Sequence, residues 1–228
     1  MTWDPRDKNE FVRLLKHNVG QITPTCSMGK YLKEAAQNTE LRTYLEIGTW
    51  NGLGSTRCFV EGFQERNYTA HPYIFYSLEC NKDKCSLAAL RYKDVPGVHI
   101  LNEVFLRDMP ADIEEIFPEL KTSNEFRYWN KVDFDNMSDK SLFLERPDLP
   151  EVFDLILLDG GEFTTWYEYL AIRDRCKILA LDDTNVMKCK RIVEDLKARP
   201  EKWEILIEDT LERNGNVVAR RRDLADKI

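Results

Sequence analysis

Short apolar runs alternate with amphipathic segments along most of this chain. Val152–Leu158 is a nearly continuous apolar run, and Leu41–Ile47 and Tyr73–Leu78 are rich in aromatic and β-branched residues. Runs of this length and composition predict strands, and the continuous one is typical of a strand buried on both faces. Shorter runs predict four further strands, at Val98–Leu101, Lys177–Leu181, Trp203–Asp209 and Asn216–Arg221.

Between these runs, apolar residues recur every three or four positions, which predicts helices. The predicted helices are Asp7–Asn18, a second one capped by Thr25 or Ser27 and running through Ala36, then Ser55–Gln64, Asn81–Tyr92, Ala111–Phe117, Thr164–Arg175 and Asn185–Ala198. Such alternation predicts an α/β fold, a parallel sheet with helices on both faces. Asn214-Gly215 between the last two runs indicates a hairpin, so the seven-stranded sheet should close with an antiparallel pair.

A single domain, residues 1–228, accounts for the length of the chain. Residues 1–40 would form an N-terminal helical cap. Residues 119–150 break the alternation, and they are polar, aromatic and long for a connection in a compact domain. This stretch is either a functional insertion, which binds an acceptor or closes as a lid, or a poorly ordered segment.

Composition narrows the range of partners. Hydrophobic content of 43% and charged content of 32% are ordinary for a soluble domain. A net charge of −7 argues against nucleic acid as the main partner, because phosphate binding leaves a basic footprint. No apolar run could span a bilayer, and the N-terminus lacks the core of a signal peptide. Six cysteines without a Cys-x-x-Cys pair favour reduced thiols and a cytoplasmic setting. A homo-oligomer is left open.

The most informative segment is residues 44–56. Its apolar run carries Glu46, and three glycines follow, Gly48, Gly52 and Gly54, before a predicted helix. A strand, a glycine turn and a helix hold adenosine-bearing cofactors at the strand ends of α/β sheets. The spacing Gly-x-x-x-Gly-x-Gly differs from the Gly-x-Gly-x-x-Gly of dinucleotide folds. A tight turn without a ligand is the simpler alternative.

Four further carboxylates come at predicted strand ends. Glu79 ends the second strand, where an acid accepts hydrogen bonds from ribose hydroxyls, or alternatively stabilises a helix N-terminus. Asp159 ends the buried strand, and Asp182 and Asp183 end the next one. Three like charges at neighbouring strand ends call for a cation, and carboxylates alone suit Mg²⁺, Mn²⁺ or Ca²⁺. Alternatively, Asp183 caps the following helix while Asp182 faces solvent.

Together these motifs resemble class I S-adenosylmethionine-dependent methyltransferases. The run Glu46 to Ser55, with Trp50 before Gly52, looks like the loop of metal-dependent sugar O-methyltransferases of the macrocin type. The stretch 103–110 (Glu-Val-Phe-Leu-Arg-Asp-Met-Pro) is similar to that family's Gly-x-Phe-x-Asp-Thr-Leu-Pro segment, and Asp159-Gly160-Gly161 and Leu181-Asp182-Asp183 resemble its metal motifs. The family often has a histidine after Asp-Gly, where this chain has Glu162.

The resemblance implies a Rossmann-like methyltransferase fold and an O-methyltransferase acting on a sugar or glycan hydroxyl. S-adenosylmethionine would be bound by Glu46, Gly48, Thr49, Trp50, Gly52, Ser55, Glu79 and Asp159, and Mg²⁺ or Mn²⁺ by Asp159, Asp182 and Asp183. Asp159 or Glu162 would take the proton, although Glu162 could instead be a charge at a helix N-terminus. Tyr128 and Trp129 are placed to stack on a sugar ring or to cover the site.

Three rival interpretations have to be compared with this one. A catechol-like or other small hydroxylated acceptor suits the same chemistry. A non-catalytic methyltransferase-like binding module would keep the fold without the reaction. A short-chain dehydrogenase shares the glycine spacing, but it needs a Tyr-x-x-x-Lys pair, and no tyrosine here has a lysine four residues later.

Overall fold

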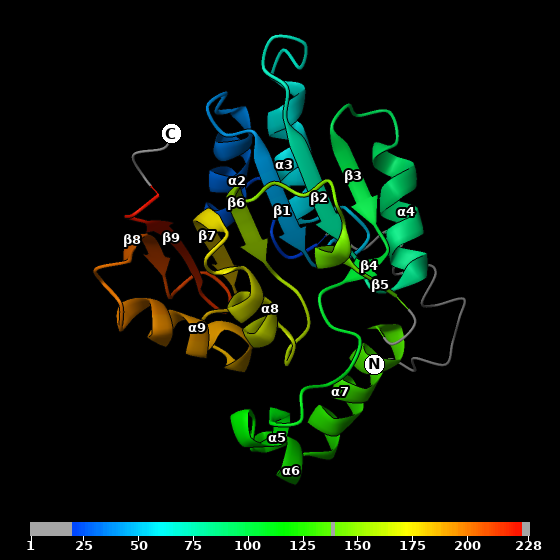
Figure 1. Ribbon diagram of the computed structural model, residues 1–228, viewed down its shortest axis with the longest axis vertical. Helices are drawn as coiled ribbons and strands as arrows, with labels where there is room; N and C mark the ends of the chain where they lie inside the picture. Colours follow the sequence, from blue (N-terminus) through cyan, green and yellow to red (C-terminus); the bar gives the residue numbers. More distant parts are fainter. Residues whose placement is uncertain (1–19, 138–139, 225–228) are drawn as a thin grey trace.

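The computed structural model describes residues 20–137 and 140–224, and the predicted helix Asp7–Asn18 lies outside these ranges. A seven-stranded sheet forms the centre, in the order β3-β2-β1-β6-β7-β9-β8 (Figure 1). Its strands are β1 Thr43–Ile47, β2 Ile74–Leu78, β3 Val98–Leu101, β6 Phe153–Leu158, β7 Cys176–Asp182, β8 Trp203–Asp209 and β9 Asn216–Arg221. The first five strands of the order run parallel, and β9 is antiparallel to both β7 and β8. The predicted sheet and its closing hairpin are confirmed.

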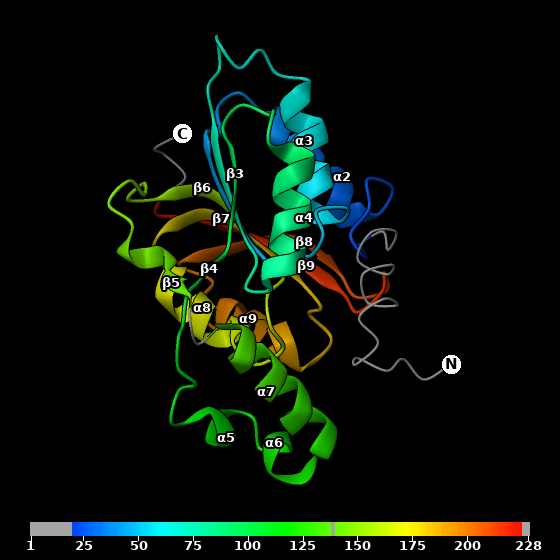
Figure 2. The same cartoon turned by 90° about the vertical axis from the view of Figure 1, so that its right-hand side faces the viewer.

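Helices cover both faces of this sheet. Figure 2 shows α2 (Ser27–Gln37), α3 (Ser55–Gln64) and α4 (Lys82–Tyr92) on one side, while α8 (Thr165–Ile172) and α9 (Met187–Lys197) lie on the other. Leu155 and Leu157 of β6 belong to the hydrophobic core between the sheet and helices α2 and α3. Ile156 and Leu158 belong to the core between the sheet and helices α8 and α9. All four are fully buried, which explains why this strand is apolar at successive positions.

The N-terminus of α2 corrects one expectation. Cys26, rather than Thr25 or Ser27, is the N-cap residue, and its Sγ accepts a hydrogen bond from the Gly29 N–H at 3.3 Å. The Ser27 N–H and hydroxyl both donate to Glu212, the N–H at 2.8 Å. The Ser27 hydroxyl, which the local pattern assigned to capping, therefore bonds a residue far away in the chain instead.

The region between β3 and β6 forms a small helical lobe. It contains α5 (Ile113–Ile116), α6 (Glu119–Thr122) and α7 (Asn124–Met137), followed by a short 3₁₀ turn at Phe143–Glu145, and a small sheet pairs β4 (Glu103–Val104) with β5 (Ser141–Leu142). The lobe lies beyond the carboxyl ends of the parallel strands (Figure 1). Residues 119–137 and 140–150 thus carry one helix of 14 residues, α7, and several shorter elements, whereas the sequence indicated none.

A buried aromatic side chain, Phe163, lies at the centre of the contact between the lobe and the sheet domain. Phe163 is fully buried, and the rings of Phe117 and Phe126 meet it edge-on at centroid distances of 5.5 and 6.0 Å. The Tyr167 hydroxyl of α8 adds a hydrogen bond of 2.9 Å to Asp112. The segment that follows Asp159 is therefore the base on which the lobe packs.

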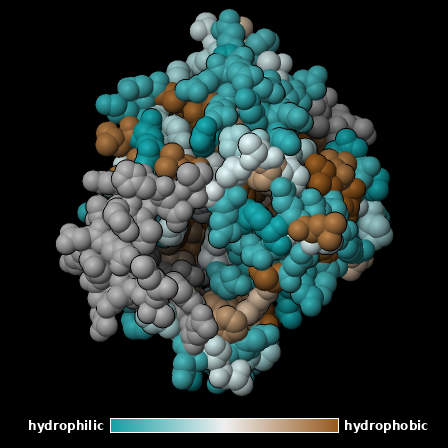
Figure 3. Space-filling model, turned by 180° about the vertical axis from the view of Figure 1, so that it is seen from behind, coloured by the Kyte–Doolittle hydropathy of each residue, from teal (hydrophilic) through white to brown (hydrophobic). Residues whose placement is uncertain are grey.

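The coloured part of the face shown in Figure 3 is mainly hydrophilic, with separate apolar areas. No helix in the described part of the chain combines the length and apolar character needed to cross a membrane. All six cysteines are free thiols, four of them buried, in keeping with the expectation of unpaired cysteines.

We predict that Gly62→Ala destabilises the fold. Helices α2 and α3 pack so closely that a Cβ at Gly62 would lie 2.4 Å from the Lys33 carbonyl oxygen. Alanine normally stabilises a helix relative to glycine by roughly 0.5–1 kcal/mol, so the steric clash reverses the usual sign. We expect a loss of about 1–3 kcal/mol in the free energy of unfolding, measured by urea denaturation. Gln64→Ala, at an exposed position of the same helix, is the control.

Candidate functional site

The candidate residues meet at one edge of the sheet. Gly48 follows β1, Glu79 follows β2 and Asp159 follows β6, while Asp182 is the last residue of β7. The N–H groups of Gly48 and Thr49 donate to the Leu78 carbonyl at 3.0 and 3.1 Å, and the Asp159 N–H donates to the Ile47 carbonyl at 2.9 Å. These bonds continue the ladders past the strand ends, so the structure brings the predicted loops together.

Contacts within the protein explain two of the loop glycines. Gly48 and Gly52 have φ angles of +104° and +79°, which side chains rarely adopt. A Cβ at Gly48 would lie 2.0 Å from the Asp159 carbonyl oxygen, and one at Gly52 would lie 2.9 Å from the Tyr92 ring. Both glycines are therefore required by the fold itself, before any ligand is considered.

Glu46 lies beneath this loop with no exposed surface. Its carboxylate accepts hydrogen bonds from the hydroxyls of Ser55 at 2.5 Å, Thr56 at 2.7 Å and Ser77 at 2.5 Å. Burial raises its pKa to about 7, and the hydroxyls oppose that rise. The Thr49 hydroxyl also bonds Ser77, at 2.5 Å. Glu46, Thr49 and Ser55 thus join the start of α3 to the sheet, and their contact with a cofactor stays a prediction.

Glu79 lies at the end of β2, where it is positioned by the backbone. Its two carboxylate oxygens accept hydrogen bonds from the N–H groups of Trp50 and Asn81, both at 2.8 Å. Burial raises the pKa of Glu79, while the positive charge of Lys84, whose ammonium lies 3.4 Å above the Trp50 ring, works against the rise. An ionised carboxylate has lone pairs beyond these two bonds, so it can also accept from ribose hydroxyls.

The alternative for Glu79 was a stabilising charge at a helix N-terminus. The N-cap of α4 is Asn81, whose side chain accepts from the N–H groups of Asp83 and Lys84, both at 3.1 Å. Helix α4 is therefore capped without Glu79, which favours the other predicted role of Glu79, the binding of ribose hydroxyls.

Asp159, Asp182 and Asp183 converge as the sequence predicted. Each offers a carboxylate oxygen, and these atoms lie within 4.8 Å of one another. The alternative arrangement is wrong, because Asp182 is only 3% exposed and the N-cap of α9 is Val186, with no side-chain cap. Carboxylate oxygens are the ligands that hard divalent cations prefer, and these three lie close enough together that they could hold one.

Two cationic side chains that the sequence analysis did not identify belong to the same cluster. The Lys188 ammonium lies 2.5 Å from Asp159 Oδ1 and 3.0 Å from Asp183 Oδ2. The Arg213 guanidinium lies 2.9 Å from Asp182 Oδ2 and 3.7 Å from Asp183 Oδ1. Three carboxylates thus face two cations, so the cluster is only partly neutralised by the protein.

The pKa shifts follow from burial and from these cations. Burial raises the pKa of Asp182 to about 6, with the neighbouring carboxylates adding to the rise. Burial also raises the pKa of Asp159, against the attraction of Lys188. For Asp183 the attraction of Lys188 and its hydrogen bond, together with that of Asn214, outweigh burial, and the pKa is lowered. The Lys188 pKa is raised because the two aspartates outweigh its desolvation.

Glu162 belongs to the same region. Burial raises its pKa, and the charges that act on it most are those of Lys188 and Asp183. The N-cap position of α8 is Thr164, two residues further on. A carboxylate beside the cluster is a candidate for accepting a proton from a hydroxyl bound there.

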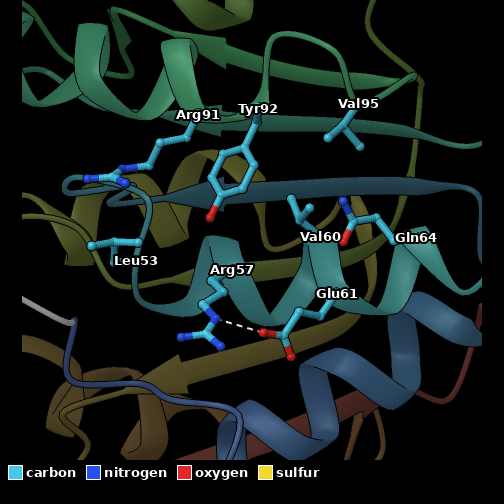
Figure 4. Close-up of a pocket in the computed structure, with 8 residues that line it drawn as sticks. All are labelled: Leu53, Arg57, Val60, Glu61, Gln64, Arg91, Tyr92 and Val95. Carbon is cyan, nitrogen blue, oxygen red and sulfur yellow. Dashed lines mark hydrogen bonds and ion pairs between the residues drawn. The ribbon is translucent and has the colours of Figure 1, made fainter.

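A surface groove of about 430 Å³ lies elsewhere, between α3 and α4 (Figure 4). Its lining includes Arg91 and Tyr92 but none of the predicted site residues. The Tyr92 hydroxyl donates to the Gly52 carbonyl, and Arg91 Nε donates to the Asn51 carbonyl at 3.1 Å. The walls of this groove therefore support the glycine loop from its outer side.

Known structures with this fold were found by comparison. They include an O-methyltransferase from Bacillus cereus in complex with SAH (TM-score 0.55, 14% identity, covering 94% of this chain and 90% of that one). TomG from Streptomyces achromogenes in complex with SAM has a TM-score of 0.55 and 15% identity, with coverages of 96% and 91%. The SAH-bound methyltransferase PaMTH1 from Podospora anserina has a TM-score of 0.51 and 13% identity, with 98% of each chain covered.

No protein-family model matches the chain, and no curated protein matches it in sequence. The likeness in structure nevertheless extends over nearly the whole of the described chain. This protein therefore has the Rossmann-like fold of the class I methyltransferases, as the sequence predicted.

We predict that Glu46 makes the stability of the protein depend on pH. Its pKa of about 7 in the folded protein exceeds the value of 4.5 expected when it is exposed, so the folded state holds the proton more tightly. This contribution is complete below about pH 4.5 and is lost as the pH rises to about 7. Relative to Glu46→Gln, the wild type should lose at most about 3 kcal/mol between pH 5 and 8.

Urea denaturation of both proteins across this range measures the difference. Glu40→Gln, at an exposed position, should leave the wild-type slope unchanged. If the wild type and Glu46→Gln have the same slope, the buried carboxylate does not titrate as described.

Proposed function

We propose that this protein transfers a methyl group from S-adenosylmethionine to a hydroxyl oxygen of a sugar, a glycan or another small hydroxylated acceptor. One observation carries the proposal: the glycine loop, Glu79 and the three aspartates share one strand-end edge, in the fold of enzymes crystallised with SAM or SAH. At this edge the glycine loop and Glu79 would bind the cofactor, and the three aspartates beside them would bind the acceptor hydroxyl through a metal ion.

The cofactor's ribose would be bound by Glu79. In α/β folds an acid at the end of the second strand accepts from both ribose hydroxyls, and the carboxylate here is already oriented by two N–H groups. The loop of Gly48, Trp50 and Gly52 would pass beside the remainder of the cofactor. Asp159 contacts this loop through Gly48, which would bring the cofactor's sulfonium group to the side of the acidic cluster.

Asp159, Asp182 and Asp183 would hold a divalent cation, Mg²⁺ or Mn²⁺. Such an ion, when bound, lowers the pKa of a coordinated hydroxyl and fixes its direction. The side chains of this chain would do the rest: they place the acceptor oxygen in line with the methyl carbon and the sulfur, which is a large part of the barrier in a displacement. Glu162 or Asp159 would take the proton from the hydroxyl.

The helical lobe is the proposed acceptor-binding segment. It lies beyond the strand ends and packs on Phe163, four residues after Asp159 (Figure 1). Tyr128 is half exposed, at 45%, which suits stacking on a sugar ring, whereas the side chain of Trp129 lies outside the described part of the structure. A catechol-like acceptor would bring two vicinal oxygens to the same carboxylates and is the second candidate.

We predict that Glu79→Ala weakens binding of S-adenosylhomocysteine at least tenfold. Hydrogen bonds to a charged group are each worth about 1.5–3 kcal/mol, and the substitution removes them from the ribose. Isothermal calorimetry measures the affinity, and Asp83→Ala, an exposed acid one turn away, is the control. Unchanged affinity in Glu79→Ala would place the cofactor elsewhere, and stronger binding of NADH than of S-adenosylhomocysteine would favour a dehydrogenase.

We predict that labelled methyl groups pass from S-adenosylmethionine to some members of a panel of sugars, oligosaccharides and catechols. Excess EDTA should abolish the transfer, and Mg²⁺ or Mn²⁺ should restore it. Asp183→Ala should lower the rate at least a hundredfold, because the acceptor oxygen loses its fixed position. Full transfer in EDTA would remove the metal from the proposal, and no transfer to any acceptor despite cofactor binding would favour a non-catalytic binding module.

A further inference from the structure

Lys188 is a cation held inside the acidic cluster. Only 6% of the residue is exposed, and its ammonium contacts both Asp159 and Asp183 within 3.0 Å. Burying an ammonium or a carboxylate is strongly unfavourable unless the group is paired with an opposite charge. The ion pairs therefore make each of these three charges tolerable in a desolvated place.

The helix fixes this position. Lys188 lies in the first turn of α9, and its neighbours Cys189 and Ile192 are fully buried against the sheet. The buried side of α9 thus carries Lys188 toward the strand ends, five residues after Asp183. Lys190, two positions further on, is exposed. The chain therefore offers a matched lysine on the same helix that does not face the cluster.

A divalent cation at the three aspartates would meet this ammonium directly. Ions of this kind bind carboxylate oxygens at about 2.0–2.6 Å, and the Lys188 ammonium already lies 2.5 and 3.0 Å from one oxygen each of Asp159 and Asp183. Two cations that share the same carboxylates repel each other at short range. Arg213 differs, because it approaches Asp182 and Asp183 from the loop between β8 and β9 and is 24% exposed.

We propose that Lys188 is the resident counter-ion of the cluster and competes with divalent metal for Asp159 and Asp183. The inference rests on the acidic cluster of the proposed function and deepens it. Without metal, the ammonium keeps the carboxylates together; metal binding requires it to withdraw. Lys188 thereby sets the metal concentration at which the site is filled.

The test is binding of Mn²⁺ alone, measured by isothermal calorimetry on the full chain without cofactor or acceptor. Lys188→Met and Lys188→Gln remove the charge, and Lys188→Gln keeps hydrogen-bond donors. Both should bind Mn²⁺ at least tenfold more tightly than the wild type. If the wild type shows no measurable binding, both variants should still bind Mn²⁺ measurably. Lys190→Met should match the wild type. Affinities of the Lys188 variants within threefold of wild type would overturn the proposal.

Thermal unfolding supplies a second measurement. In EDTA the Lys188 variants should melt below the wild type, because two carboxylates lose their counter-ion, and Mn²⁺ should raise their melting temperature more than that of the wild type. If both variants remain unfolded in Mn²⁺ as well as in EDTA, metal cannot replace the ammonium and the proposal is wrong. Wild-type methyl transfer in EDTA would refute the metal in the proposed function, whereas tighter Mn²⁺ binding by the variants would still support the role of Lys188.

Discussion

The structure depends on the partners that stabilise buried carboxylates at the edge where the parallel strands end. Parallel strands bring their ends to the same place, and here each of four strands delivers an acid there or just before it. Desolvation disfavours every one of these charges, as the raised pKa values of Glu46 and Asp182 show. Neighbouring residues supply the hydrogen-bond donors and cations that these buried acids require.

Three kinds of partner are used, and they define three parts of the edge. Glu46 is surrounded by hydroxyls, so it is enclosed and joins helix α3 to the sheet. Glu79 is held by backbone N–H groups, which orient it but leave lone pairs for a ligand. The aspartates share the cationic side chains of Lys188 and Arg213, and we propose that a metal ion can displace the first of these. The same residue type is thus fully enclosed, open to a further hydrogen-bond donor, or paired with a cation, according to the donor beside it.

The sequence predicted the sheet, its hairpin and the convergence of acids because these follow from local patterns and from the geometry of parallel strands. The helix Ser55–Gln64 was predicted with its observed bounds because it begins directly after the glycines. Lys188 and Arg213 were not identified, since isolated charged residues usually face solvent and their partners become visible only in three dimensions. The same holds for Cys26, which caps α2 while Ser27 bonds Glu212. In the lobe, α6 has four residues, too few for a periodic signal, whereas α5 lies within the predicted helix 111–117. The 14-residue helix α7 is long enough for such a signal but was missed, because its mixture of charged and aromatic residues was interpreted as an irregular insertion.

The glycine loop shows why a motif and its function have to be argued separately. Gly48 is required by the Asp159 carbonyl and Gly52 by Tyr92, so the loop would need both residues in a protein that binds no cofactor. What the motif establishes is direct contact between the loop after β1 and the loop after β6. Because Phe163, in the second loop, packs against Phe117 and Phe126 of the helical lobe, one connected set of contacts joins the proposed cofactor loop, the acidic cluster and the proposed acceptor segment. If the cofactor and the acceptor bind where we propose, a displacement at the cluster, such as withdrawal of Lys188, would act on the surroundings of both.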